Sequence, residues 1–230
     1  MWEGTDGTGG FLGKTIMKFI LFSKVTFEIA HPIALIESYC FQNDIYSSYD
    51  ILEDRKIEDV NKIGARISSE QLKQCKTVIK KSKKLTLFKY DLDRFLKLNE
   101  RTRNKHIKNL NDQVVQRLLI LPKIGFSKAT KILHTRYPKV IPMIDNPLQN
   151  KYRQINRDWN ENKADQILID YYNNLLIEEN RKNLDKIETV ISKNNLKGLT
   201  RIRIFDILWW SYLKADRLRQ EKEINWLSIK

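Results

Sequence analysis

The organisation of this chain follows from two short segments, Leu121-Pro-Lys-Ile-Gly-Phe-Ser-Lys-Ala-Thr-Lys-Ile-Leu133 and Ile141-Pro-Met-Ile-Asp145. Pro122 ends a helix, because proline lacks an amide hydrogen and disfavours the helical conformation of the residue before it. Gly125 permits the turn that follows, and apolar residues then recur at helical spacing. The two segments predict a helix–hairpin–helix, followed by a carboxylate that leaves a buried stretch at Asp145.

Backbone groups of this hairpin are expected to form an anion site. We expect helices over residues 112–121 and 127–135, with Gly125 at positive φ between them. The first N–H groups of the second helix have no partner within it, and they carry the positive end of the helix dipole. Such a site fits a phosphate of a nucleic acid. Nearby basic residues that could add charge are Lys123, Lys128, Lys131, Arg101 and Arg103.

The positive charge of the chain is concentrated around the hairpin. The protein has 230 residues and a formal net charge of +14. Residues 62–151 hold 22 of its 42 Lys and Arg but only 6 of its 28 Asp and Glu. A localised positive field attracts polyphosphate and releases its counterions. Two interpretations stay open: a nucleic-acid-binding surface, or a solvated lysine-rich face on an ordinary pair of packed helices.

Composition and periodicity predict an all-α fold. The 8 Gly and 5 Pro are too few for a strand-dense fold with many turns, so they favour long helices. We expect residues 1–25 to be a flexible N-terminal segment and residues 26–230 to form one helical domain with the hairpin at residues 112–135. Apolar spacing indicates further helices at residues 32–41, 68–80, 91–98, 164–179, 182–193 and 200–214.

Several classes of protein are excluded by residue counts. Cys40 and Cys75 are too few for a disulfide framework or a four-cysteine iron–sulfur cluster, and they fit a reducing, cytoplasmic setting. The apolar segment at residues 16–29 is too short and too charged to span a membrane, so no membrane partner is expected. The three His residues lack zinc-ligand spacing, and we expect neither a metal nor another cofactor.

Asp145 has two interpretations. It can cap the helix that begins at Asn146-Pro147, since Asp is a preferred N-cap and Pro is tolerated in the first turn. A carboxylate beside an anion site can also stabilise a cationic sugar or orient an attacking water. Cleavage of an N-glycosidic bond needs such a group, because positive charge grows on the sugar as the base leaves.

Leu-Pro-x-Ile-Gly-x-Ser-x-Ala, followed at this separation by Pro-x-Ile-Asp, resembles the helix–hairpin–helix DNA glycosylase superfamily, which contains endonuclease III and the adenine-mismatch glycosylases. The resemblance covers residues 113–152. It implies a two-lobed helical fold in which a base of double-stranded DNA is flipped into a cleft beside the hairpin. It also implies that Asp145 is the catalytic aspartate, and that Ser127 occupies the position of the Schiff-base lysine. The implied activity is that of a monofunctional DNA N-glycosylase, a hydrolase of DNA repair.

The resemblance further implies DNA contacts by Lys123, Ile124, Gly125, Ser127, Lys128 and Lys131. Glu37 lies on an early predicted helix, where the adenine-mismatch enzymes carry a general acid, but its spacing from Pro32 departs from theirs and favours a surface or helix-capping glutamate. Lys123 departs from the pattern by replacing the first hairpin glycine, at a cost of about 1 kcal/mol if that position has positive φ. A non-catalytic nucleic-acid-binding module on the same fold is the alternative function, and a structural helical protein is the third.

Overall fold

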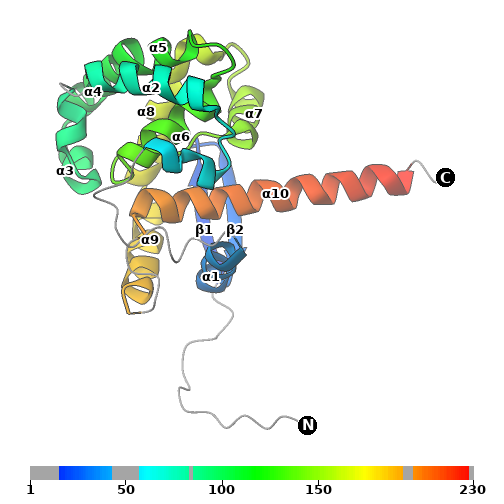
Figure 1. Cartoon of the computed structure of the whole chain (residues 1–230). Coiled ribbons are helices and arrows are strands. Elements are labelled where there is room, and N and C mark those ends of the chain that lie inside the picture. Colours follow the sequence, from blue (N-terminus) through cyan, green and yellow to red (C-terminus); the bar gives the residue numbers. More distant parts are fainter. Residues whose placement is uncertain (1–15, 43–56, 83–84, 194–198, 228–230) are drawn as a thin grey trace.

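The chain is mostly helical in the computed structural model, which describes residues 16–42, 57–82, 85–193 and 199–227 (Figure 1). The expected helical class is confirmed. Every helix predicted from apolar spacing is present. The described α-helices are α1 (Pro32–Gln42), α2 (Ser69–Ser82), α3 (Leu92–Lys97), α4 (Glu100–Leu110), α5 (Gln116–Leu119), α6 (Phe126–Arg136), α7 (Asn146–Ile155), α8 (Ala164–Leu176), α9 (Glu178–Ile191) and α10 (Arg201–Leu227). Shorter helical turns are η1 (Ile57–Ile63), η2 (Thr86–Lys89), η3 (Asn111–Val115) and η4 (Glu161–Lys163).

A two-stranded antiparallel sheet is added to the expected helices. Strand β1 (Ile16–Leu21) pairs with β2 (Val25–Ala30) in a register that places Phe19 opposite Phe27. Both rings are buried and stack with their centroids 5.5 Å apart, while alternate residues of the strands face outward. One face of the sheet therefore belongs to the hydrophobic core.

Helix α9 anchors this sheet through Asn180 and Asn183, and Asn183 Nδ2 donates to the Lys18 carbonyl at 2.7 Å. The amide of Asn180 accepts a hydrogen bond from the Ile20 N–H at 2.8 Å and donates one to the Ile20 carbonyl at 2.7 Å. The prediction of a flexible N-terminal segment is therefore wrong for residues 16–25, and residues 1–15 lie outside the described residues.

The first helix of the hairpin is much longer than expected. It begins with α4, whose N-cap Asn99 accepts a hydrogen bond from the Thr102 N–H at 2.9 Å, and continues through η3, one π-helical turn, into α5. The predicted start at Asp112 is wrong, because that residue lies within the π-helical turn. Buried side chains along this helix include Ile107, Leu110, Val114, Val115 and Leu118.

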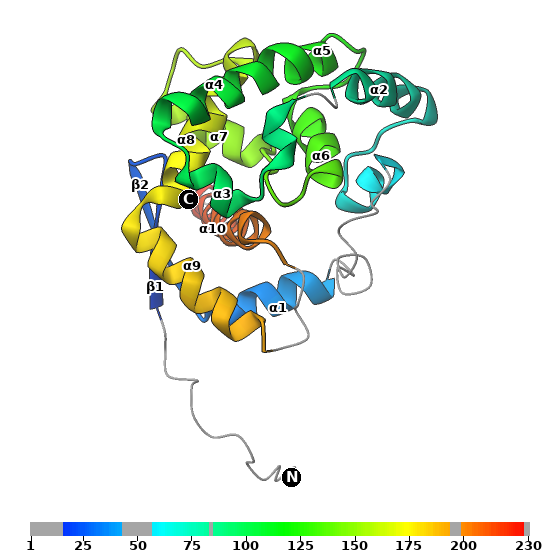
Figure 2. The same cartoon turned by 90° about the vertical axis from the view of Figure 1, so that its left-hand side faces the viewer.

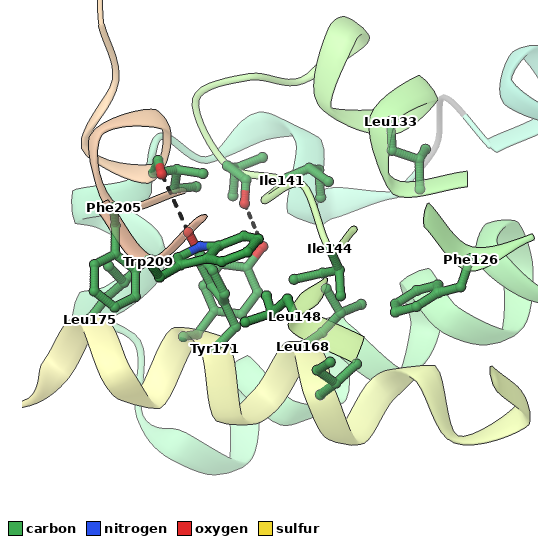
Figure 3. Packing of buried hydrophobic residues seen from close by; sticks show 14 of the residues in the cluster. Phe126, Leu133, Ile141, Ile144, Leu148, Leu168, Tyr171, Leu175, Phe205 and Trp209 are labelled. Atoms are coloured by element: carbon green, nitrogen blue, oxygen red, sulfur yellow. Dashed lines mark hydrogen bonds between the residues drawn. The ribbon is translucent and has the colours of Figure 1, made fainter. Parts of the chain in front are cut away.

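Helix α10 lies against the rest of the chain on several sides. It contacts α1, α9 and β2 and also α7, and Figure 2 shows it end-on between these groups. The core that it shares extends from Phe205 and Trp209, past Ile144 and Leu148, to Phe126 of α6 (Figure 3). None of the described helices combines the length and the apolar character that crossing a membrane requires.

Candidate nucleic-acid interface and active-site cavity

The turn of the hairpin has positive φ at Lys123, where φ is 62°, and not at Gly125, where φ is −86°. The expectation for Gly125 is therefore wrong, and the suspected strain at Lys123 is present. The Gln71 side chain supports the turn by donating to the Pro122 carbonyl at 2.8 Å. Gly125 instead acts as the N-cap of α6, which begins at Phe126.

The amide end of α6 faces an open hollow of about 580 Å³. The first hydrogen bond of this helix joins the Ala129 N–H to the Gly125 carbonyl at 3.0 Å, so the N–H groups of residues 126–128 precede the ladder. Gly125, Ser127 and Lys128 border the hollow. Asp145 borders the same hollow, so the structure brings the predicted anion site and the predicted carboxylate to one opening.

Charges around this hollow are mixed. Arg66, Lys128 and Lys131 border it, but so does Glu161. The Oε1 atom of Glu161 lies 3.8 Å from the point that a Cβ atom on Gly125 would occupy. A carboxylate at that place opposes a phosphate approaching the amides, so the basic residues must outweigh it for an anion to bind.

Asp145 is the N-cap of α7, as one of its two interpretations predicted. Its Oδ1 atom accepts a hydrogen bond from the Leu148 N–H at 3.3 Å. The preceding Ile144 N–H donates to Thr130 Oγ1 at 3.1 Å, and the Ile144 carbonyl accepts from Gln149 Nε2 at 3.1 Å. Capping fixes the carboxylate but leaves it half-buried, at the border of a second space.

This second space is a cavity of about 330 Å³ behind Asp145. Its walls combine aromatic side chains with charged groups of both signs, and they include Tyr39, Lys131, Asp145, Arg203, Asp206 and Trp210. The Tyr39 and Trp210 rings meet edge to face at 5.3 Å. The guanidinium of Arg203 lies 5.2 Å from the Tyr39 ring centroid and donates to its hydroxyl at 3.0 Å. Aromatic walls with a few convergent polar groups are typical of small-ligand sites.

Burial changes the acid–base properties of the groups between the two spaces. Burial raises the pKa of Asp145 to about 6, although the Leu148 N–H, Lys131, Arg203 and Trp210 all act in the opposite direction. Burial also lowers the pKa of Lys131, against the pull of Asp145. A shifted carboxyl group with a cationic neighbour in a cavity is typical of functional sites.

Several predicted contact residues lie elsewhere. The prediction for Arg103 is wrong, because its side chain is buried and donates to the carbonyls of Leu96 and Leu98. Arg101 is exposed on α4 and borders neither space. Glu37 is half-buried on α1 and does not line the cavity.

Within the hairpin, the predicted contacts divide by accessibility. Lys123 is exposed on the turn, whereas Ile124 is buried and can offer only backbone groups to a partner. Ser127 borders the open hollow but not the cavity behind Asp145. Lys131, one helical turn further along α6, lines both spaces.

Helix α10 supplies cavity residues that the sequence interpretation did not select. Arg203 and Asp206 are both buried and stand three residues apart on the helix that was predicted at residues 200–214. Two buried charges at that spacing in an apolar helix were the available signal, since charged side chains are rarely buried without a partner. The described residues contain no cluster of His, Cys, Asp and Glu that could hold a metal ion.

Comparison of the chain with protein-family models, with curated proteins and with solved structures finds no match.

Proposed function

We propose that this protein binds double-stranded DNA at the hairpin and hydrolyses an N-glycosidic bond at the cavity, with Asp145 as the key carboxylate. One observation carries the proposal: Asp145 borders both the hollow at the amide end of α6 and the cavity behind it. A strand held at the hollow would thus place a rotated nucleotide beside a desolvated carboxylate.

The proposed binding step uses the amide end of α6. A phosphate contacts the N–H groups of residues 126–128, and Lys123 and Lys128 neutralise neighbouring phosphates. A base then leaves the stack and enters the cavity, where the faces of Tyr39 and Trp210 offer stacking surfaces. Unstacking costs a few kcal/mol, and stacking on these rings offsets part of that cost.

The proposed chemical step is hydrolysis. The bond between the sugar C1′ and the base nitrogen breaks, and its electron pair leaves with the base, which takes up a proton. Water adds to C1′ and releases a proton. The carboxylate of Asp145 stabilises the positive charge that develops on the sugar, and its raised pKa suits it to accept the proton of the water.

A non-catalytic DNA-binding module is the second candidate, and Glu161 favours it. A carboxylate beside the hairpin amides weakens phosphate binding at the place where catalysis would need tight placement. The left-handed Lys123 adds strain that a glycine would avoid. Both features fit a protein that binds DNA weakly and does not hydrolyse an N-glycosidic bond.

The deciding experiment is a panel of duplexes carrying damaged or mismatched bases, assayed for released base. Release from one member, abolished in Asp145→Asn while DNA affinity persists, supports the glycosylase. Salt-dependent binding without release from any member supports the binding module. Absence of salt-dependent binding contradicts both.

A further inference from the structure

Asp206 is a buried carboxylate that the proposed reaction does not use. It lies on α10, is 1% exposed, and contributes to the wall of the cavity. Its Oδ1 atom accepts hydrogen bonds from the Tyr171 hydroxyl at 2.6 Å and from the Trp209 indole at 3.2 Å. Its Oδ2 atom accepts one from the backbone N–H of Met143 at 3.1 Å. All three partners are donors, so this position needs acceptors on both oxygens.

The bond to Met143 connects Asp206 to Asp145. Met143, Ile144 and Asp145 are consecutive, and each has its own anchor: Asp206 for the first, Thr130 for the second and the Leu148 cap for the third. The anchor at Met143 is the only one of these three that comes from α10. It ties the segment carrying Asp145 to the helix that forms the cavity wall.

Keeping a carboxylate at this place opposes stability. Burial raises the pKa of Asp206 to about 7, although Arg203 and the three donors favour its ionised form. An apolar side chain would avoid that cost, but it would leave the donors of Met143, Tyr171 and Trp209 without an acceptor. A costly buried charge with fixed partners beside a cavity is typical of residues retained for function.

We propose that Asp206 is a positioning residue for Asp145: its bond to the Met143 amide holds the Asp145 carboxylate at the border between hollow and cavity. Tyr171 and Trp209 orient Asp206 in turn. The catalytic consequence rests on the proposed glycosylase function, whereas the structural coupling between the two aspartates does not. Arg203 acts on both carboxylates and extends the coupling through charge.

The charged and titratable groups around Asp145 and Asp206 determine the direction in which the pKa of Asp145 should change when Asp206 is replaced. Asp145 is faced by Lys131 from α6 and by Arg203 and Trp210 from α10. Asp206 is faced by Arg203 and Trp209 from its own helix and by the hydroxyl groups of Tyr171 and Tyr172 from α8. Replacing Asp206 with Asn removes a negative charge that competes for Arg203, so the carboxyl of Asp145 should then titrate at lower pH.

The test compares Asp206→Asn with Tyr172→Phe as a matched control. Tyr172 is the neighbour of Tyr171, and its equally buried hydroxyl donates to the Val140 carbonyl and not to Asp206. Tyr171→Phe serves as a milder variant, because it keeps the Asp206 side chain but removes one donor that orients it, which should loosen the Met143 bond without abolishing it. All variants are made in the full chain.

The first readout is NMR, which requires no substrate. In Asp206→Asn, hydrogen exchange at the Met143 amide should be at least about tenfold faster than in Tyr172→Phe, because an amide group offers one acceptor oxygen where three donors converge. The carboxyl carbon of Asp145, assigned with Asp145→Asn, should titrate at lower pH. Unchanged Met143 exchange and Asp145 titration relative to the control overturn the proposal. If Asp206→Asn does not fold, Tyr171→Phe decides: Met143 exchange should be faster than in Tyr172→Phe, by a smaller factor, and unchanged exchange there overturns the proposal.

The second readout is the rate of base release from a duplex that the wild-type protein cleaves at its N-glycosidic bond. With Asp206→Asn, we expect kcat to fall at least about tenfold while DNA affinity stays within about twofold, with the acid limb of the pH profile moved to lower pH. A normal kcat and pH profile in this variant contradicts positioning. If the wild-type protein releases no base, the proposed function fails, and the NMR arm still decides whether the two aspartates are coupled.

Discussion

The hollow at the hairpin and the cavity behind it share Asp145 but are built in different ways. The hollow takes much of its lining from two neighbouring segments, residues 125–131 and 145–147. The cavity draws on α1, η1, α6 and α10, which are remote in sequence. The hollow is open and offers backbone amides, whereas the cavity offers aromatic faces and paired charges. Apart from Gly64, Lys131, Asp145 and Trp210, which line both spaces, the lining residues differ, so substitutions can address the proposed binding and the proposed chemistry separately.

Asp145→Asn gives the largest expected effect. Base release should fall by a factor of about 10² to 10³ or more, because the carboxylate that stabilises the sugar cation is removed. Asn is an equally good N-cap, so the fold and DNA affinity should persist. Single-turnover base release and DNA binding, measured on the same preparation, check both halves. Loss of affinity together with activity would show that the two spaces are not separable.

Reversing charge at the hollow should weaken DNA binding and leave the rate of base release almost unchanged, which is the opposite of the result expected for Asp145→Asn. Lys123→Glu combined with Lys128→Glu should weaken DNA binding by about tenfold or more, and should reduce the salt dependence of log K by roughly one for each phosphate that is no longer neutralised. Single-turnover release at saturating DNA should change little, since neither lysine lines the cavity. Lys139→Glu, at an exposed position that borders neither space, is the control.

The stability of the protein should reveal the raised pKa of Asp145. Its folded pKa of about 6 exceeds the ordinary 3.8, so ionisation costs the folded state increasingly as pH rises between these values and fully above about 6. Asp145→Asn should therefore be more stable than wild type at about pH 8, by at most about 3 kcal/mol, and the difference should shrink near pH 4. Urea unfolding at both pH values measures it. A difference in the free energy of unfolding that does not depend on pH would contradict the raised pKa of Asp145.

Glu161→Gln tests the opposing charge at the hollow. Removing this carboxylate should strengthen DNA binding by roughly twofold to fivefold, because a partly exposed charge contributes less than about 1 kcal/mol. The gain should vanish at high salt. Glu100→Gln, an exposed acid on α4, provides the comparison. An equal gain from both variants would mean that only net charge matters.

The smallest expected effect concerns the turn. Lys123→Gly should raise the free energy of unfolding by about 0.5 kcal/mol, since relief of left-handed strain is partly offset by the greater freedom of glycine in the unfolded chain. Gly125→Ala should be nearly neutral in stability, because an added Cβ would meet only the Glu161 side chain at ordinary contact distance. Thermal unfolding measures the stability of both variants. A large loss of stability in Gly125→Ala would contradict the backbone conformation of this turn.

Local signals explain why the hairpin could be predicted and parts of it could not. The helix end before Pro122 and the cap at Asp145-Asn-Pro147 depend on neighbouring residues. The sequence therefore predicted the end of the first helix to within about two residues and the N-cap role of Asp145. The left-handed residue was misassigned to Gly125, because glycine is the usual choice and Lys123 carries no such signal.

The β-hairpin and the cavity had only weak local signals. The turn between β1 and β2 places Phe22 and Ser23 at positive φ, where Asn-Gly would be the typical pair, so nothing marked it as a hairpin. The alternation of apolar and polar residues in β2, Val25-Thr-Phe-Glu-Ile-Ala30, is typical of a strand, but it covers only six residues. Arg203 and Asp206 reach Asp145 only through the packing of α10, and helical periodicity does not reveal which distant segment a face will meet.

The place of α10 in the chain has a consequence for biosynthesis. A polypeptide emerging from the ribosome acquires α4 to α7, and with them the amide end of α6, well before Arg203, Asp206 and Trp210 are synthesised. A nascent chain can thus form the amide end of α6 at the hollow before the cavity behind Asp145 has its α10 wall. Translation would then order the two proposed steps in time, with DNA binding coming first and base release only after α10 has packed against α7.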